Sequence, residues 1–264
     1  TRYKEGSPDY TEFWRFERLK CTTGVIINGR YITNHYYFYL NYTPIYNVVE
    51  GSQTFAEIWD SHYHYTLLKA LAREKSQYTS VLKKRRWGFS YLECAELHRQ
   101  FILEKFSITR LIHDDEETNK KNWEIIDSYR NWTNQHTGWF RAVRHGYPKI
   151  IQEVEIVSET EGSKKVDIKG LHSVIESVVT RQKASKGVGK YANYILYDEA
   201  GTNAKLLKSI SYNEKNIKQG SVVKGFISIG GSVGELKDCE DLKKIQADIL
   251  DRYWIMVKPQ GKLV

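Results

Sequence analysis

A basic segment with one glycine lies between an apolar, β-branched run at 78–82 and a helix-like pattern from Ser90. Its sequence is Lys83-Lys84-Arg85-Arg86-Trp87-Gly88-Phe89-Ser90. A phosphate-binding loop needs free backbone N–H groups, a cation near the terminal phosphates and a hydroxyl for Mg²⁺ at a helix start. Gly88 and Ser90 meet these needs. The standard GxxxxGK[ST] pattern fails, however, because Phe89 stands at the lysine position and Lys83 at the first glycine position. Alone, the segment also fits an ordinary basic turn.

Two adjacent carboxylates end an apolar run in YILYDEAG, which places Asp198 and Glu199 at the carboxyl end of an expected strand. In a nucleotide hydrolase, the first carboxylate holds the metal ion, and the second orients and deprotonates the attacking water. Acidic residues end strands in many other proteins as well. The pair therefore indicates nucleotide hydrolysis without establishing it.

A third strand-like run ends in small residues in FISIGGS, which contains Ser228, Gly230 and Ser232. A polar turn at such a place can sense the terminal phosphate and couple its loss to movement. We expect Ser228 and Gly230 to take part in nucleotide binding. The order of this run after the acidic pair supports the interpretation more than its composition does.

Strand-like and helix-like segments alternate along most of the chain, which predicts an α/β fold with a largely parallel sheet. In such a sheet the carboxyl ends of the strands bind ligands, so the three segments above would converge at one edge. We expect strands at 78–82, 107–112, 150–157, 164–170, 194–197 and 222–229. We expect helices at 55–75, 90–105, 116–140, 202–217 and 241–254.

Residues 1–54 are rich in aromatic side chains, and we interpret them as a small N-terminal subdomain ahead of a core at 55–264. The stretch 31–49 combines β-branched and aromatic residues between Asn28-Gly29 and Pro44, which predicts short strands or a hairpin. Its aromatic rings could stack on a nucleobase, but a small hydrophobic core is the interpretation we favour.

The composition sets the broad class of the protein. The chain has 264 residues, 41% of them hydrophobic, which is enough for a sizeable core. No run of about 18 apolar residues occurs, so we expect no membrane span. The formal charge of +8 favours a polyanionic partner, although many proteins are this basic without a specific reason.

Other clusters of reactive side chains are weaker candidates. The three cysteines lie far apart without metal-ligand spacing, so we expect free thiols. His62 and His64 are two residues apart and would diverge on a helix. The acidic run HDDEE at 113–117 is interpreted as a solvated loop in preference to a second metal site.

Taken together, the motifs resemble those of the large terminases of tailed double-stranded DNA bacteriophages. KKRRWGFS is similar to their deviant Walker A motif, in which the essential lysine can stand at the start of the loop, where Lys83 lies. Arg86 matches the terminase arginine ahead of the Xaa-Gly pair, YILYDEAG resembles their Walker B motif, and SIGGS resembles their coupling motif. The resemblance extends over roughly residues 12–235.

The resemblance implies a P-loop NTPase of the additional-strand, catalytic-glutamate type with ATP and Mg²⁺ as cofactors. Lys83 and Arg86 would neutralise phosphate charge, Ser90 and Asp198 would hold Mg²⁺, and Glu199 would activate water. The rest of the loop, Lys84, Arg85, Trp87, Gly88 and Phe89, would complete the nucleotide site. Because terminase motors act as rings, one subunit would donate an arginine to the next, and Arg181 is our candidate.

The resemblance also implies a motor that translocates DNA into the procapsid, with double-stranded DNA, the portal protein and the small terminase subunit as partners. The expected location is the host cytoplasm, with transient docking on the procapsid. Large terminases carry a C-terminal nuclease, and the chain ends soon after the coupling motif, so we expect no DNA cleavage. Two alternatives remain open: another P-loop motor, such as a helicase-like or defence ATPase, and a non-catalytic nucleic-acid-binding domain.

Overall fold

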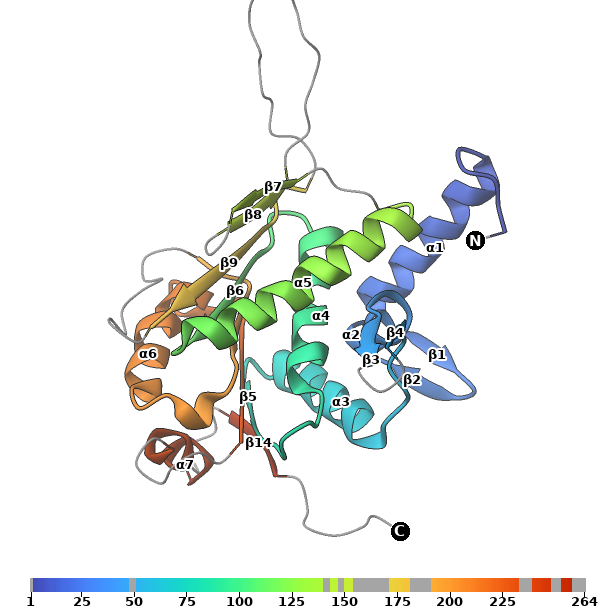
Figure 1. The fold of residues 1–264 in the computed structure, drawn as a ribbon. Coiled ribbons are helices and arrows are strands. Elements are labelled where there is room, and N and C mark those ends of the chain that lie inside the picture. The colour runs from blue at the N-terminus through green and yellow to red at the C-terminus, as the bar shows by residue number, and fades with distance from the viewer. Residues whose placement is uncertain are drawn as a thin grey trace, which may run out of the picture.

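An eight-stranded sheet forms the centre of the computed structural model (Figure 1). The structure describes residues 2–47, 51–139, 143–146, 150–153, 171–180, 191–232, 239–247 and 253–257. Within them the strand order is β14-β5-β13-β10-β6-β9-β8-β7. The strands from β14 to β9 are parallel, whereas β8 and β7 add an antiparallel edge. The prediction of a largely parallel α/β sheet is therefore confirmed.

The strands of this sheet are short and mostly apolar. In chain order they are β5 (Tyr78–Leu82), β6 (Ile108–His113), β7 (Val143–Gly146), β8 (Ile150–Glu153), β9 (Val174–Val179), β10 (Tyr194–Tyr197), β13 (Phe226–Gly231) and β14 (Tyr253–Val257). Separate two-stranded sheets are β1 (Val25–Ile27) with β2 (Arg30–Ile32), β3 (Ile45–Asn47) with β4 (Ser52–Thr54), and β11 (Lys218–Gln219) with β12 (Val222–Val223).

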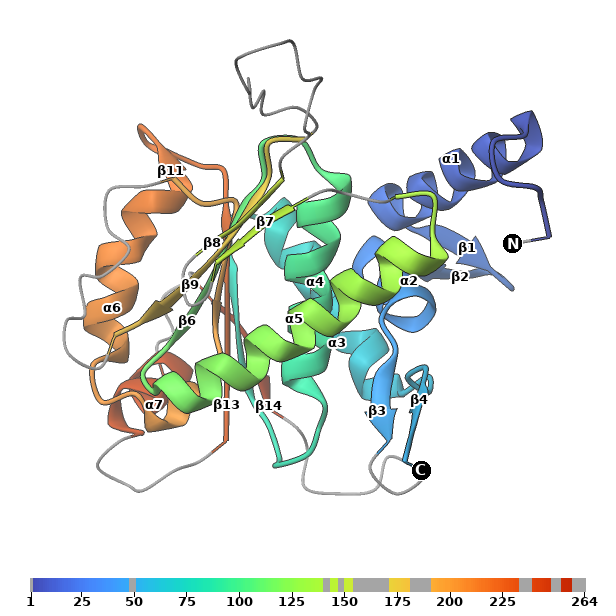
Figure 2. The same cartoon turned by 45° about the horizontal axis from the view of Figure 1, so that its top comes forward.

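Helices cover both faces of the central sheet (Figure 2). One face carries α3 (Asp60–Glu74), α4 (Phe89–Leu103) and α5 (Glu116–His136), with α1 (Pro8–Thr23) and α2 (Asn34–Tyr42) packed outside them. The other carries α6 (Leu206–Asn213) and α7 (Glu240–Ala247), along with the short helices η1 (Ala200–Thr202) and η2 (Glu214–Ile217). None of the helices in the described ranges combines the length and apolar character needed to cross a bilayer.

Alternating side chains of β10 show why its whole sequence is apolar. Tyr194 and Leu196 pack in the cluster under α3, α4 and α5, whereas Ile195 and Tyr197 pack in the cluster under α6 and α7. Successive side chains of a strand point to opposite faces, and both faces of this sheet are covered. The run YILY therefore occupies the middle of a three-layer core.

The aromatic stretch at 31–49 was predicted to form strands or a hairpin, and this is wrong for its centre. Residues Asn34–Tyr42 form α2, and the Thr33 hydroxyl caps it by accepting a hydrogen bond from the Tyr36 backbone N–H at 3.2 Å. Tyr36, Phe38, Tyr39 and Tyr42 are buried at helical spacing. Packing and a cap here outweigh the preference of aromatic residues for strands.

Several predicted boundaries also differ from the structure. Helix α3 begins at Asp60 instead of residue 55, and the expected strand at 222–229 is divided into β12 and β13 at Lys224-Gly225. The expected turn at 230–232 begins inside a strand, because Gly230 and Gly231 belong to β13. The last helix is described over Glu240–Ala247, and Tyr253–Val257, whose first two residues were expected to be helical, forms β14 beside β5. The expected strand at 164–170 lies outside the described residues.

The N-terminal segment shares its core with the sheet. Trp14 of α1 and Tyr36 of α2 belong to the same hydrophobic cluster as Leu92 of α4 and Leu196 of β10. A boundary at residue 54 between a subdomain and the ATPase core remains a prediction.

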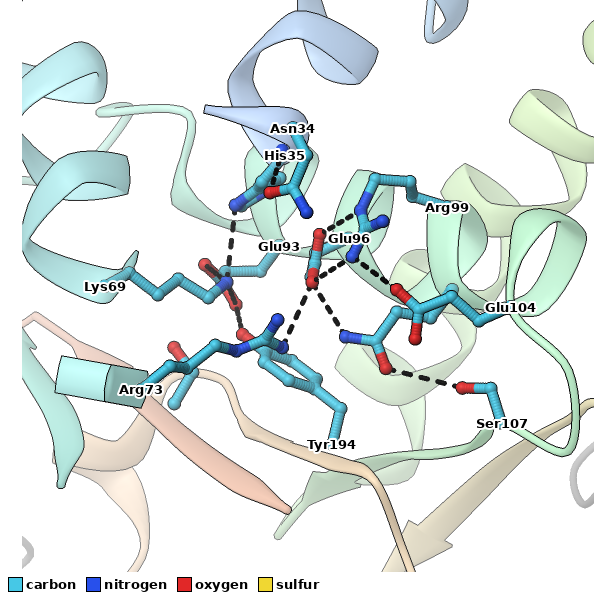
Figure 3. Close-up of polar contacts among 12 residues, drawn as sticks. Asn34, His35, Lys69, Arg73, Glu93, Glu96, Arg99, Glu104, Ser107 and Tyr194 are labelled. Carbon is cyan, nitrogen blue, oxygen red and sulfur yellow. Dashed lines mark hydrogen bonds and ion pairs between the residues drawn. The ribbon is translucent and has the colours of Figure 1, made fainter. Parts of the chain in front are cut away.

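A buried ionic network ties α3 and α4 to the sheet (Figure 3). The Lys69 ammonium lies 2.7 Å from a carboxylate oxygen of Glu93, and both side chains are almost fully buried. Tyr65 and Tyr194 also donate hydrogen bonds to the Glu93 carboxylate. Burial raises the pKa of Glu93, but the ammonium of Lys69, His35 and the hydrogen bond from Tyr194 together more than offset this, so the pKa lies below its ordinary value. Glu93 is therefore an ionised group in the core.

A second carboxylate of α4 extends this network. Glu96 accepts hydrogen bonds from Arg99 at 2.7 Å and Gln100 at 2.7 Å, and it pairs with Arg73 of α3 at 3.1 Å. Arg99 also pairs with Glu104 at 2.8 Å. Each buried charge thus has several partners, which is the condition under which buried ions are tolerated.

We predict that Lys69→Met lowers the free energy of unfolding by about 3–5 kcal/mol, because it leaves the Glu93 carboxylate buried without its cation. Urea denaturation measures this loss. The Lys69→Met/Glu93→Gln double variant removes both charges and should be more stable than Lys69→Met alone. A double variant whose loss equals the sum of the two single losses would contradict the pairing.

Candidate nucleotide site

Three segments meet at the carboxyl edge of the sheet. The basic loop follows β5, the Asp198-Glu199 pair follows β10, and Ser232 follows β13, which lies between the other two strands. The Lys83 backbone N–H donates to the Gly231 carbonyl at 3.0 Å, which joins the loop to the end of β13. The strand order therefore brings together residues that are far apart in the chain.

An ion pair links the basic loop to the acidic pair. The Lys83 ammonium lies 2.6 Å from a carboxylate oxygen of Glu199, and its side chain is only 6% exposed. Burial raises the pKa of Glu199, but the contact with Lys83 and the hydrogen bonds from Ser232 together more than offset this effect and hold the pKa below its ordinary value. Glu199 is therefore ionised near neutral pH, as a general base must be.

A hydroxyl and an amide converge on the other carboxylate. Ser90, in the first turn of α4, donates a hydrogen bond of 2.6 Å to Asp198, and Asn122 of α5 donates one of 2.8 Å to the same oxygen. The other oxygen of Asp198 accepts from the Glu199 backbone N–H at 2.9 Å. Carboxylate and hydroxyl oxygens are ligands that Mg²⁺ accepts, so Ser90 and Asp198 suit this ion.

Within the described residues, no group of three or more His, Cys, Asp or Glu could hold a metal ion. Mg²⁺ is commonly bound through one or two protein oxygens together with substrate phosphates. The Ser90–Asp198 pair fits this mode of binding better than a metal site made by protein alone.

The turn after β10 has an unusual backbone. Glu199 has a left-handed conformation with φ of 47°, which a non-glycine residue seldom adopts. Gly231 lies against it: a Cβ atom on Gly231 would come within 2.5 Å of the Gly201 nitrogen. Ser232 donates a hydrogen bond of 3.2 Å to Glu199. Gly231 of FISIGGS thus lets the end of β13 contact the turn at Glu199 directly.

The basic loop has an exposed and a buried part. Lys84, Arg85 and Arg86 are at least partly exposed, and Arg86 has a positive φ of 62°. Trp87 is buried instead, and its indole donates to the Ser61 hydroxyl at 2.9 Å. His62 donates a hydrogen bond of 2.7 Å to the Trp87 carbonyl, so α3 holds the loop from behind. Gly88 has a φ of 81° and starts α4 in the left-handed region.

Three residues predicted to contact nucleotide lie inside the fold. Ser228 is fully buried about 10 Å before the end of its strand and contacts Tyr65 at 2.8 Å. Phe89 is buried against Gly230, on which a Cβ atom would come within 2.2 Å of the phenyl ring. These residues connect β13 with α3 and α4, and of the three Phe89 also lies beside the Asp198–Lys83 cluster, with the Lys83 ammonium 5.8 Å from the centre of its ring.

Sequence reasoning missed two polar residues beside Asp198. Asn122 lies on the buried face of α5 with Asn119, Trp123 and Ile126, and a polar residue in such a stripe is a usable signal. His113 ends β6, whose neighbour is β10, and it is buried. The interpretation of 113–117 as a solvated loop is thus wrong for His113. Arg181 lies outside the described residues, so its role remains a prediction.

The strand order and the edge residues define a class of protein. P-loop NTPases of the additional-strand, catalytic-glutamate type have one strand inserted between two others. One of these two strands precedes the phosphate-binding loop, and the other ends in the Asp-Glu pair. Here β13 is that inserted strand, between β5 and β10. The fold is that of this class.

Comparison with solved structures finds similar folds among phage large terminases. The fold is similar to that of the HK97 bacteriophage large terminase, with a TM-score of 0.54 and 11% identity over 86% of this chain and 44% of that chain. For the Thermus phage P74-26 large terminase ATPase domain, the TM-score is 0.43 and the identity is 15%, and the match covers 61% of each chain. For the large terminase of another thermophilic bacteriophage, in complex with ADP, the TM-score is 0.47 and the identity is 9%. That match covers 73% of this chain and 44% of that chain.

This chain therefore has the fold of the phage large terminase ATPase domain, which confirms the resemblance at the level of the fold. It spans less than half the length of the HK97 protein. No protein-family model and no curated protein matches the sequence.

The contact between Gly230 and Phe89 yields a stability prediction. Gly230→Ala should lower the free energy of unfolding by about 1–3 kcal/mol, because the new methyl group overlaps the phenyl ring. Adding Phe89→Leu should remove part of that overlap, so the double variant should lose less than the sum of the single losses. Denaturant titration of the four proteins measures the coupling, and strict additivity would contradict the contact.

Proposed function

We propose that this chain hydrolyses ATP and is the ATPase motor of a phage large terminase, which moves double-stranded DNA into the procapsid. The observation that carries the proposal is the pairing of Lys83 with Glu199 and of Ser90 with Asp198 at one sheet edge. These are a cation, a general base, a hydroxyl and a metal-binding carboxylate, the set that phosphoryl transfer to water requires.

Both pairs are well suited to exchange partners when nucleotide binds. The Lys83 ammonium now contacts a carboxylate oxygen, and an ATP phosphate oxygen would offer it the same charge. The Ser90 hydroxyl donates a hydrogen bond to Asp198, and the oxygens of both residues would hold Mg²⁺ when it binds. When bound, Mg²⁺ would neutralise the charge that develops on the phosphates.

Release of Glu199 from Lys83 would free its carboxylate for catalysis. Glu199 would orient a water molecule and accept its proton as the water oxygen attacks the terminal phosphorus. The bond from that phosphorus to the bridging oxygen breaks, and ADP and phosphate leave. Exposed Arg86 lies in the same loop and would contribute positive charge to the phosphates.

DNA translocation rests on the terminase fold and on the formal charge of +8. We further propose that the motor works as a ring in the host cytoplasm, docked on the portal protein of the procapsid and supplied with DNA by the small terminase subunit. Arg181 would act on the nucleotide of a neighbouring subunit.

We predict that Glu199→Gln lowers the ATPase rate about 10²–10⁴-fold, because the amide cannot accept the proton of the attacking water. It should keep its affinity for ATP with Mg²⁺, measured by calorimetry. Lys83→Ala should lose both affinity and rate. Glu117→Gln and Lys208→Ala, on exposed surfaces of α5 and α6, are matched controls. Wild-type protein that neither binds nor hydrolyses ATP would contradict the enzyme proposal.

Packaging assays distinguish a terminase motor from other motors of the same fold. The wild-type chain, assembled with portal-bearing procapsids, should protect double-stranded DNA from added nuclease in an ATP-dependent way, and Glu199→Gln should not. Separation of DNA strands without packaging would instead favour a helicase-like motor.

A further inference from the structure

His113 lies at the carboxyl edge of the sheet, next to the strand that ends in Asp198 and Glu199. It is the last residue of β6, and Ile112 of that strand is in register with Tyr197 of β10. His113 and Asp198 therefore leave adjacent parallel strands side by side. His113 is only 3% exposed.

The hydrogen bonding of His113 leaves one ring nitrogen with a proton and no acceptor. Its Nδ1 accepts a hydrogen bond of 2.9 Å from the Asp115 backbone N–H, so in the neutral ring the proton is on Nε2. That Nε2 is buried and has no hydrogen-bond partner among the residues that the structure describes. Buried donors in folded proteins almost always have an acceptor, and at this edge of the sheet a bound ligand could supply one.

Burial and the nearby carboxylates act on the His113 ring in opposite directions. Burial lowers the pKa of His113, and the carboxylates of Asp198, Asp115, Glu199 and Asp114 offset this effect only in part. A neutral N–H donor suits an oxygen acceptor and cannot ligate a metal ion through Nε2 while it keeps its proton.

The two neighbouring carboxylates do not need this donor. One Asp198 oxygen accepts from the Glu199 backbone N–H, and the other accepts from Ser90 and Asn122. Glu199 already accepts from Lys83 and Ser232. In a site for a nucleoside triphosphate, an oxygen of the bound phosphate would offer this donor a charged acceptor.

We propose that the Nε2–H of His113 donates a hydrogen bond to an oxygen of the terminal phosphate of the bound nucleotide. This inference rests on the proposed ATPase function and adds a nucleotide-binding residue to it. The position beside Asp198 and Glu199, the groups assigned to the metal ion and the attacking water, favours the terminal phosphate over the inner two. His113 would thereby distinguish a nucleoside triphosphate from a diphosphate.

Two substitutions separate the role of Nε2 from that of Nδ1. In His113→Asn the amide oxygen can take the place of Nδ1 and keep the bond from Asp115, but no donor reaches the Nε2 position. In His113→Gln the longer side chain places an amide nitrogen near the Nε2 position, with loss of the Asp115 contact. Calorimetry with Mg²⁺ and either ADP or a non-hydrolysable ATP analogue measures both affinities for each variant.

We expect His113→Asn to bind the ATP analogue about tenfold more weakly and ADP unchanged, because a hydrogen bond to a charged acceptor is lost. His113→Gln should restore most of the affinity for the analogue, even where its melting temperature falls. Equal losses for ADP and the analogue, or no loss for either in His113→Asn, would overturn the inference. Should His113→Asn not fold, a His113→Gln protein that binds ADP normally but the analogue tenfold more weakly would overturn it as well.

The wild-type protein serves to separate the two proposals. Wild-type binding of both nucleotides together with an unaffected His113→Asn removes only the role of His113. Wild-type protein that binds neither nucleotide removes the ATPase proposal and the inference that rests on it.

Discussion

Parallel pairing of β13 between β5 and β10 is the constraint on which the rest of the site depends. It is made of backbone hydrogen bonds in register from Tyr194↔Phe226 to Tyr197↔Ile229 on one side and from Ser228↔Thr79 to Gly231↔Leu82 on the other. Because all three strands point the same way, their carboxyl ends lie at one edge. A cation from one loop and two carboxylates from another can then meet within hydrogen-bonding distance.

The polar side chains at this edge of the sheet are paired with one another. Lys83 with Glu199, and Ser90 with Asp198, each satisfy a charge or hydroxyl that is largely removed from water. An unpaired ion in such a place would be costly, so the pairs stabilise the site in the absence of nucleotide. The same pairs hold each group close to where phosphate and cation would bind, which limits the rearrangement that binding demands.

The buried network below the edge connects the site to the outer helices. Glu93 contacts Lys69 of α3 and Tyr194 of β10 (Figure 3). It lies one turn after Ser90 on α4 and also accepts a hydrogen bond from Tyr65 of α3. Tyr65 also contacts Ser228 of β13. A displacement of β13 or α4 cannot occur without a change at these buried polar contacts, whose partners are few and specific. Ser228, which we expected at the nucleotide, instead belongs to this connection.

The pattern of apolar residues in the sequence by itself determined the strands that carry the candidate site residues. The runs YTSVL, SITRLI and YILY are buried on both faces, and their largely apolar, β-branched and aromatic character predicts strands without any tertiary knowledge. The position of Asp198, Glu199 and Lys83 at strand ends follows from the same pattern. Sequence also indicated the terminase resemblance, through a loop that departs from the standard phosphate-binding motif.

Tertiary structure alone decided which residues lie beside these. Helix α2 forms from an aromatic stretch because its tyrosines pack against α4 and α1, a long-range contact that local propensity does not record. β14 pairs with β5, a strand far away in the chain. Asn122 reaches Asp198, and His113 ends the strand beside it, only because α5 packs on β6 and β6 pairs with β10. Phe89 and Ser228 turn inward because Gly230 leaves room for the phenyl ring and Tyr65 offers a buried partner, a matter of volume and contact that a motif cannot express.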